Sequence, residues 1–204
     1  MTEKTKYSFK CMEQTCSNRV CCTRDRVNVT LGDLSRWTTQ NHIGQILPAL
    51  TLVTQNEEDQ VYLETKRKPL AKSPENTSCI FFIEESNGCA IRFSRPISCR
   101  TFPLQYDGEK FRVSNKACPG IGKGEVTPEA LKEARALAEE EYKERLETAS
   151  ALPPLYALIV GEMMQQSAAT MSSLSEEDRK KIQEILSKAP DGKTQDSAQG
   201  SNKD

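Results

Sequence analysis

Four cysteines within twelve residues near the start of the chain constrain the fold more than any other feature. The segment reads Cys11-Met-Glu-Gln-Thr-Cys16-Ser-Asn-Arg-Val-Cys21-Cys22, and mostly polar residues without helical periodicity separate the thiols. A loop of this composition has too few apolar side chains to hold its own shape. We therefore expect a bound metal or contacts with the rest of the chain to hold it.

The other four cysteines are equally concentrated. Nine residues separate each of the next three, and all eight lie before the helical C-terminal part of the chain. Buried structural cysteines would be scattered through the core, including the helices. Thiolates are soft ligands for zinc, copper(I) and iron–sulfur clusters. We predict that all eight are metal ligands, in one site or two: Cys11, Cys16, Cys21, Cys22, Cys79, Cys89, Cys99 and Cys118.

The expected compartment supports metal ligation over disulfides. The first twenty residues contain no apolar run typical of a signal peptide, and no window reaches the length of a membrane span. We expect a soluble cytoplasmic protein, where reducing conditions disfavour structural disulfides. Redox disulfides and inert thiols are the alternatives.

The spacing does not identify a standard metal site. It lacks the paired Cys-x-x-Cys motifs of a zinc ribbon and the run of a bacterial ferredoxin. It also lacks the tight three-cysteine loop of a radical adenosylmethionine enzyme. Because adjacent Cys21 and Cys22 rarely bind the same simple ion, one of them bridges, serves a second metal or is a nearby redox thiol.

The pattern before residue 125 predicts a small α+β domain with short antiparallel strands. Thr30 and Asp33 resemble a capping box for a helix over 31–41, with Leu34 and Trp37 on its buried face. Residues 56–59 are typical of a hairpin loop, and residues 61–63 of a strand. The basic segment 66–74 indicates a surface connection, or alternatively a docking patch.

A hairpin is predicted around Asn87-Gly88. Strands at 78–83 and 89–93 would bring Cys79 and Cys89 close together. Arg95-Pro96 ends the returning strand, and the chain runs on to a last strand-like piece at 111–113. Gly120-x-Gly122-x-Gly124 favours a turn over a nucleotide-binding loop, and the only histidine, His42, is more typical of surface than of a ligand.

The composition changes at residue 125, where a helical extension is expected. Thr127-Pro128-Glu129 starts a helix with an apolar stripe, Pro153-Pro154 should break it, and a second helix follows over 155–171. A third is expected over 175–188. We divide the chain into a metal-binding domain (1–125), a helical extension (126–188) and a disordered tail (189–204).

The residues also resemble a known family. Phe9-x-Cys11, the Cys21-Cys22 doublet, and above all Gly88-Cys89-x-Ile91-x-x-x-Arg95-Pro96-x-x-Cys99-Arg100-x-Phe102-Pro103 are similar to the YkgJ-type cysteine-cluster family. The family is described as a zinc- or iron-chelating domain, flagellin N-methylase-like. The resemblance covers about residues 9–124 and implies an iron–sulfur or zinc protein.

Two arginines in this motif are candidate supporting residues. Four thiolates around zinc or a four-iron cluster leave a negative site, which Arg95 and Arg100 would stabilise. A surface arginine–carboxylate pair is the alternative. Pro96 and Pro103 are expected to fix the backbone so that Cys99 points inward.

We therefore expect a metal-binding protein that carries an iron–sulfur cluster, 4Fe-4S favoured, or zinc. It would act in electron transfer or assist a partner enzyme. An enzyme related to protein lysine N-methylation is an alternative that the resemblance suggests, although the chain has no adenosylmethionine-binding motif. A non-catalytic, metal-stabilised adaptor is another. The net charge of -1 argues against nucleic acid, and a protein partner is expected at the C-terminal helices.

Overall fold

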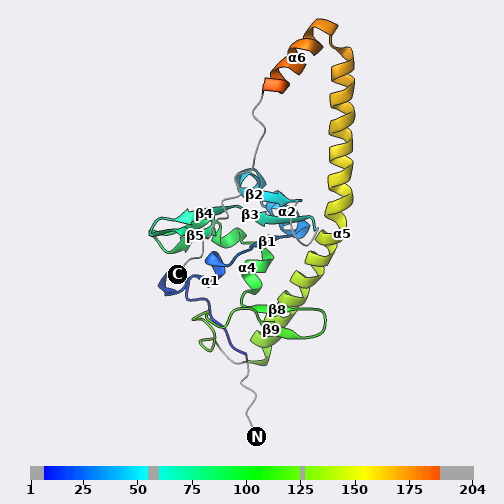
Figure 1. Cartoon of the computed structure of the whole chain (residues 1–204). Coiled ribbons are helices and arrows are strands. Elements are labelled where there is room, and N and C mark those ends of the chain that lie inside the picture. Colours follow the sequence, from blue (N-terminus) through cyan, green and yellow to red (C-terminus); the bar gives the residue numbers. More distant parts are fainter. Residues whose placement is uncertain (1–6, 55–59, 125–126, 189–204) are drawn as a thin grey trace, which may run out of the picture. The chain divides into compact units, whose positions relative to one another are not determined.

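The computed structural model describes residues 7–54, 60–124 and 127–188, and it has the α+β fold expected (Figure 1). Its contacts divide the chain into two compact units, the first ending at Leu155 and the second beginning at Tyr156. The predicted hairpin loop at 56–59 and the predicted disordered tail at 189–204 lie outside the described residues. The predicted domain boundary at residue 125 concerns independent folding and stays a prediction.

The core forms around one helix and one small sheet. Helix α2 (Leu31–Thr39) begins with the predicted capping box, in which Thr30 Oγ1 accepts from the Asp33 amide and Asp33 accepts from the Thr30 amide. Strand β3 (Tyr62–Thr65) lies between β1 (Asn28–Val29) and β2 (Leu50–Val53), with antiparallel pairing on both sides.

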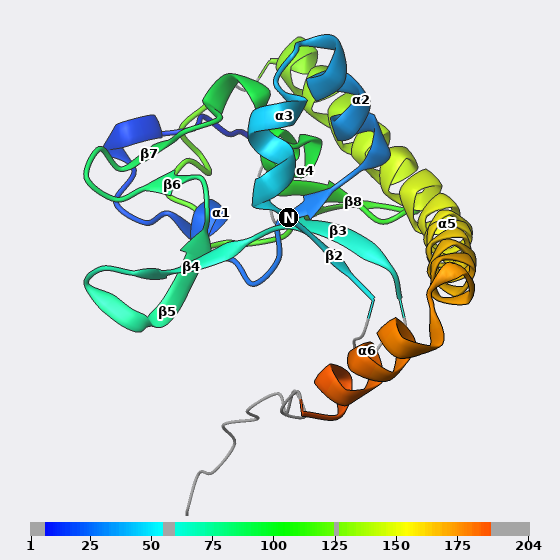
Figure 2. The same ribbon diagram turned by 90° about the horizontal axis from the view of Figure 1, so that it is seen from above.

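Trp37 is the largest fully buried side chain. It packs with Val29, Ile46 and Leu50, and its Nε1 donates to the Ser94 carbonyl at 2.6 Å. Short α3 (Ile43–Ile46) and the 3-10 helix η2 (Leu47–Ala49) connect α2 to β2, and α3 lies near the start of β2 (Figure 2). The predicted burial of Trp37 is therefore confirmed.

Residues 66–74 lie at the surface, as predicted, but they form part of a hairpin and not an irregular connection. Strands β4 (Arg67–Leu70) and β5 (Ser73–Cys79) form an antiparallel hairpin there. The Arg67 guanidinium donates to the carbonyls of Thr77 and Thr23, so a cationic side chain that indicates surface instead joins this hairpin to the N-terminal segment. Pro69 is tolerated beside an irregularity of the register.

The hairpin at Asn87-Gly88 is confirmed in a shorter form. Strand β6 (Phe82–Ile83) pairs with β7 (Gly88–Cys89), and Asn87 has a positive φ of 48°. The predicted extension of the second strand to residue 93 is wrong, because residues Arg92–Ser94 form the 3-10 helix η3. The Ser94 carbonyl accepts the hydrogen bond from Trp37 Nε1 and is therefore not available to a neighbouring strand.

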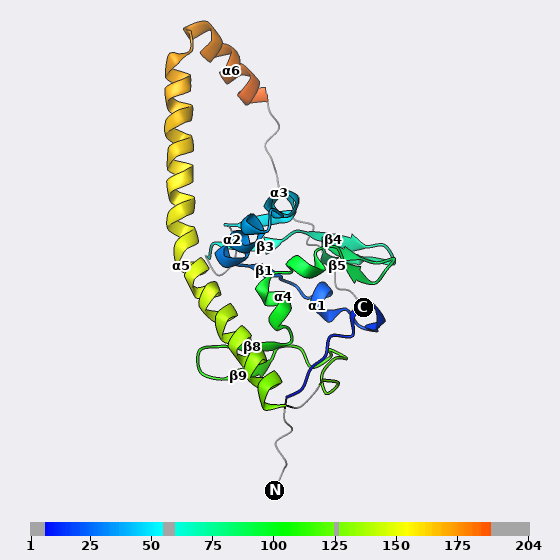
Figure 3. The ribbon, with the colours of Figure 1, turned by 180° about the vertical axis from the view of Figure 1, so that it is seen from behind.

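After the hairpin, the chain forms α4 (Ile97–Thr101), which carries Cys99. Strands β8 (Leu104–Tyr106) and β9 (Phe111–Val113) then form the last antiparallel pair. Two short elements precede the sheet, the 3-10 helix η1 (Glu13–Thr15) and α1 (Val20–Thr23). In two opposed views, the part of α5 before Leu155 runs beside α2 and the β8–β9 pair (Figure 3).

Helix α5 (Pro128–Ser173) continues through Pro153-Pro154, so the predicted break there is wrong. Proline removes an amide donor and crowds the preceding turn, which disfavours a helix without forbidding it. The prolines instead lie next to the division between the two units. Helix α6 (Glu176–Lys188) confirms the third predicted helix. None of the helices in the described ranges is long and apolar enough to cross a membrane.

Candidate metal centre

Most of the cysteines meet at one cavity in the first unit. The cavity has a volume of about 40 Å³ and is lined by thiols from the N-terminal loop, α1, β5, β7 and α4. Six of the eight cysteines line it: Cys11, Cys21, Cys22, Cys79, Cys89 and Cys99. Cys79 is buried and the others are half-buried. Tertiary folding thus gathers donors that are up to 88 residues apart in sequence (from Cys11 to Cys99).

Hydrogen bonds from the β6–β7 turn hold the N-terminal cysteine loop. The Asn87 side-chain amide donates to the carbonyls of Gln14 and Cys16, both at 2.8 Å. Its Oδ1 accepts from Arg19 Nε at 2.8 Å. This loop, which lacks an apolar core of its own, is therefore held by the turn that also places Cys89.

A second contact fixes Cys11. The Lys10 amide donates to the Gly120 carbonyl at 3.0 Å, and Phe9 forms an antiparallel bridge with Ile121. A Cβ atom on Gly120 would overlap the Lys10 backbone, and one on Gly124 would overlap that of Phe9. These glycines therefore allow a turn to pack against the N-terminal segment. A turn is what the sequence analysis predicts for them.

Cys99 faces the cavity because α4 is anchored at its start. The Ile97 amide donates to Asp33 Oδ1 at 2.9 Å, and the Cys99 amide donates to the Pro96 carbonyl at 2.9 Å. Pro96 and Pro103 are fully buried on either side of the helix. The Phe102-Pro103 peptide bond is cis. Cys99 thus lines the cavity, as expected from the prolines.

The adjacent pair Cys21 and Cys22 has unequal acidity. Their Sγ atoms are 3.8 Å apart, and the hydrogen bond from Cys22 lowers the pKa of Cys21 to about 6. Burial opposes this shift, whereas the charges of Arg24, Arg19 and Arg95 assist it. The same hydrogen bond raises the pKa of Cys22, and burial raises that of Cys99 to about 11. One thiolate is therefore favoured near neutral pH before any metal binds.

One guanidinium that contacts a thiol belongs to a residue that the sequence analysis did not predict. Arg24 Nη2 lies 3.4 Å from Cys99 Sγ and 3.3 Å from Ser98 Oγ. Arg24 lies two residues after the Cys21-Cys22 doublet, and this position is the feature of the sequence that could have identified it. Arg95 lines the cavity together with Arg19 and Arg92, whereas Arg100 is exposed and lines a different cavity. The supporting roles of Arg95 and Arg100 stay predictions.

Two predicted ligands, Cys16 and Cys118, and the single histidine of the sequence also lie outside this cavity. Cys16 Sγ donates to the Asn18 carbonyl at 3.1 Å, and neither Cys16 nor Cys118 lines the cavity. His42 Nδ1 forms a hydrogen bond with Ser94 Oγ at 2.7 Å. The predicted ligand roles of Cys16 and Cys118 remain predictions.

The donor set suits a soft metal, but the side chains are not arranged for coordination as they stand. Within residues 7–54, 60–124 and 127–188, no three Cys, His, Asp or Glu side chains converge closely enough to hold one ion. Half-buried cysteines change position through rotation about their side-chain bonds. The cavity therefore supplies the chemistry for zinc or iron, and binding requires several thiols to turn toward one point.

The comparison with protein families identifies the class. The family model CxxCxxCC, described as "Putative zinc- or iron-chelating domain", matches residues 10–119, more than half of the chain. The chain belongs to this family. The matched region ends just after Cys118 and contains all eight cysteines. Searches of curated proteins and of solved structures find no match.

Proposed function

We propose that the six cysteines of the cavity bind zinc or iron as thiolates, with an iron–sulfur cluster, 4Fe-4S favoured, as the iron form. With iron, the centre would act in electron transfer or assist a partner enzyme. The single observation that carries this proposal is the meeting of six cysteines from separate segments at one cavity. The family's description as a zinc- or iron-chelating domain supports it.

The charges around the cavity support a thiolate centre. Four thiolates give either a zinc ion or a four-iron cluster a net negative charge, and low-dielectric surroundings make such a charge costly. Arg19 and Arg95 line the cavity, and Arg24 contacts Cys99, whereas Arg92 is paired with Glu13. These guanidinium groups would lower the cost of burying the thiolates.

The volume of the cavity and the exposure of its cysteines affect which metal can bind. A cavity of about 40 Å³ has room for a single ion. A four-iron cluster needs the loop from Cys11 to Cys22 to move outward, and this loop is held by surface hydrogen bonds rather than by a core. The half-buried cysteines place the centre near the surface, where electron exchange with a partner protein is feasible.

Anaerobic purification followed by an absorption spectrum and by iron, sulfide and zinc analysis tests the proposal. A brown protein with iron and acid-labile sulfide would support a cluster. A colourless protein with stoichiometric zinc would exclude electron transfer and leave a structural role for the centre. A protein without either metal after reconstitution would contradict the proposal itself.

Replacement of one cysteine tests the ligand set. Cys99→Ser should lower both metal content and the free energy of unfolding, because metal binding and folding are coupled. Elemental analysis and denaturant unfolding measure the two effects. Cys118→Ser is the matched comparison, since Cys118 does not line the cavity. Equal metal loss in both variants would assign Cys118 to the site, and unchanged metal in Cys99→Ser would remove Cys99 from it.

The second unit favours a further candidate function, a metal-stabilised adaptor. Large apolar side chains are exposed along the part of α5 after Leu155, among them Leu158, Ile159, Met163 and Met164. Such side chains on a helix are typical of protein-binding surfaces. Capture of partners by the full chain and by a chain lacking residues 156–188 tests this role, and identical partners in both would contradict it.

A further inference from the structure

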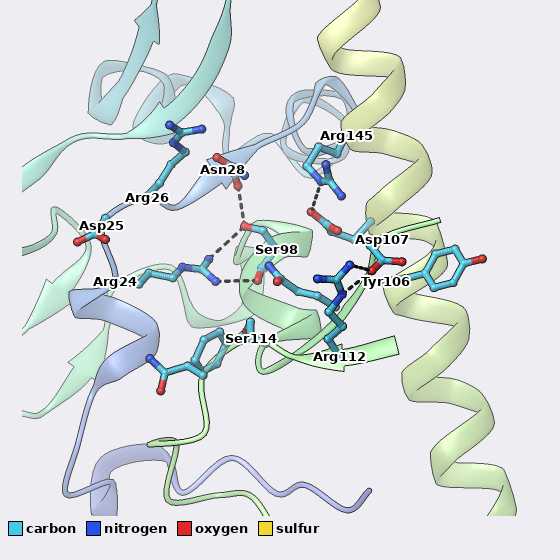
Figure 4. A pocket seen from close by; sticks show the side chains of 14 residues that line it. Arg24, Asp25, Arg26, Asn28, Ser98, Tyr106, Asp107, Arg112, Ser114 and Arg145 are labelled. Carbon is cyan, nitrogen blue, oxygen red and sulfur yellow. Dashed lines mark hydrogen bonds and ion pairs between the residues drawn. The ribbon is translucent and has the colours of Figure 1, made fainter. Parts of the chain in front are cut away.

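A second cavity in the first unit gathers four arginines. It has a volume of about 680 Å³, within the range of small-molecule sites, and it opens to solvent. Arg24 and Arg26 come from the segment between α1 and β1, Arg112 from β9 and Arg145 from α5 (Figure 4). Four like charges from distant parts of the chain thus surround one space.

The carboxylates of the cavity neutralise only part of this charge. Arg112 pairs with Asp107, and Arg145 Nε lies 3.3 Å from Glu141 Oε1. The remaining carboxylate, Asp25, is exposed. In the part of the chain that the structure describes, neither Arg24 nor Arg26 forms an ion pair. The charges of Glu64 and Glu141 act on Arg26 and Arg24 from nearby, but neither carboxylate pairs directly with these two guanidinium groups.

The two unpaired arginines are held in place by other contacts. The Arg26 guanidinium lies 4.0 Å from the centre of the Tyr62 ring, which covers one of its faces. Arg24 donates to the Ser98 carbonyl and hydroxyl, both at 3.3 Å, and Figure 4 shows these contacts on the cavity wall. Its Nη2 also lies 3.4 Å from Cys99 Sγ, so Arg24 lies between this cavity and the metal centre. Pre-positioned guanidinium groups lose little freedom when they bind an oxyanion.

The rest of the wall also suits a polar ligand. Gln105, Ser114 and Asn115 add hydrogen-bonding groups. Phosphate and carboxylate groups are the ligands that arginine recognises through paired N–H donors. We propose that this cavity binds a small anionic molecule through phosphate or carboxylate groups, with Arg26 as its main accessible contact. The proposal does not require a bound metal, although the cavity shares Arg24 with the metal centre.

Titration of the full-length protein with inorganic phosphate and, separately, with succinate tests this site. Both probes are weak metal chelators, so they leave the cysteine centre intact. Calorimetry gives the affinity, and ¹H–¹⁵N spectra of arginine Nε–H groups report which side chains respond. We expect the Arg26 and Arg24 signals to shift with at least one probe. The probe that binds more tightly assigns the ligand to the phosphate or the carboxylate class.

Three variants distinguish binding at this cavity from a general effect of the protein's positively charged side chains. Arg26→Gln should weaken binding about tenfold, the equivalent of one good ionic contact, and Arg26→Lys should keep part of the affinity because it keeps the charge. Arg179→Gln removes the same charge from exposed α6, outside the cavity, and should leave binding unchanged. The absence of binding by either probe, or an equal loss in Arg26→Gln and Arg179→Gln, would overturn the proposal.

Discussion

At the scale of single residues, Asp33 connects three parts of the fold. Its buried carboxylate accepts from the Thr30 amide at the start of α2 and from the Ile97 amide at the start of α4. It also pairs with Arg36, whose guanidinium binds Glu144 of α5. One side chain thus joins a helix cap, the helix that carries Cys99 and the first half of the long helix.

Asp33→Asn should lower the free energy of unfolding by about 1–3 kcal/mol, because a buried acceptor and its charge are lost while the donors remain. Denaturant unfolding measures the change. Asp178→Asn is a suitable control, since Asp178 is exposed at the start of α6 and should cost at most about 0.5 kcal/mol. Equal costs in the two variants would show that Asp33 is no more than a local cap.

The pH dependence of stability has an identifiable source in Glu144. Burial alone would raise its pKa, but hydrogen bonds from Arg36 and Thr30 and the charge of Arg36 lower it below the usual 4.5. Because the folded pKa lies below the unfolded one, the stabilisation is complete above about pH 4.5 and is lost as the pH falls through the folded pKa.

Glu144→Gln should therefore cost about 1–3 kcal/mol at neutral pH and progressively less in acid. Unfolding curves measured from about pH 3 to 7 give this difference directly. Glu147→Gln, which removes only an exposed partner of Lys143, should show little change at any pH. A difference between wild type and Glu144→Gln that stays constant with pH would contradict the assignment.

At the scale of elements, the turn after Cys118 packs against the segment before Cys11. Gly120→Ala should destabilise the protein by about 1–3 kcal/mol and reduce its metal content, because the added methyl group overlaps the Lys10 backbone. Thermal unfolding and elemental analysis test this. Gly44→Ala is the control, since open space surrounds Gly44 within α3 and alanine there should be neutral or stabilising. Unchanged metal content and stability in Gly120→Ala would show that this turn does not support the metal centre.

Elements that depend only on neighbouring residues are the ones that the sequence predicts correctly. The capping box, the start of α6 and the Asn87-Gly88 turn depend on residues within a few positions of one another, and all three are confirmed. The hairpin at 67–79 is also a local pairing, but its basic, proline-containing sequence is untypical of a strand, and Arg67 additionally donates to Thr23, far away in sequence. A window on the sequence contains only one side of that interaction.

At the scale of the whole molecule, the first part of α5 belongs to the cysteine-bearing unit. The Leu31 amide donates to Thr148 Oγ1 at 2.9 Å, Arg36 binds Glu144, and Ala138 is fully buried. A boundary at residue 125 would remove all of these contacts. The compact unit that ends at Leu155 keeps them.

A chain that ends at Leu155 should therefore retain the metal content and unfolding midpoint of the full protein. A chain that ends at residue 125 should unfold at lower denaturant concentration, because it leaves Arg36 and the Leu31 amide without their partners. Denaturant unfolding and metal analysis compare the two. Equal stability of both truncated chains would support the predicted domain boundary at residue 125.

The amino-acid sequence was sufficient for the α+β class and for the zinc- or iron-chelating family, because these depend on residue types and short spacings. Tertiary structure decided which thiols meet, that Arg24 touches Cys99 and that α5 continues through its two prolines. These outcomes depend on contacts between residues far apart in the chain, such as Asn87 with the N-terminal loop and Asp33 with Ile97. Local propensity contains no information about such contacts, since their free energy exists only once the separate segments have folded together.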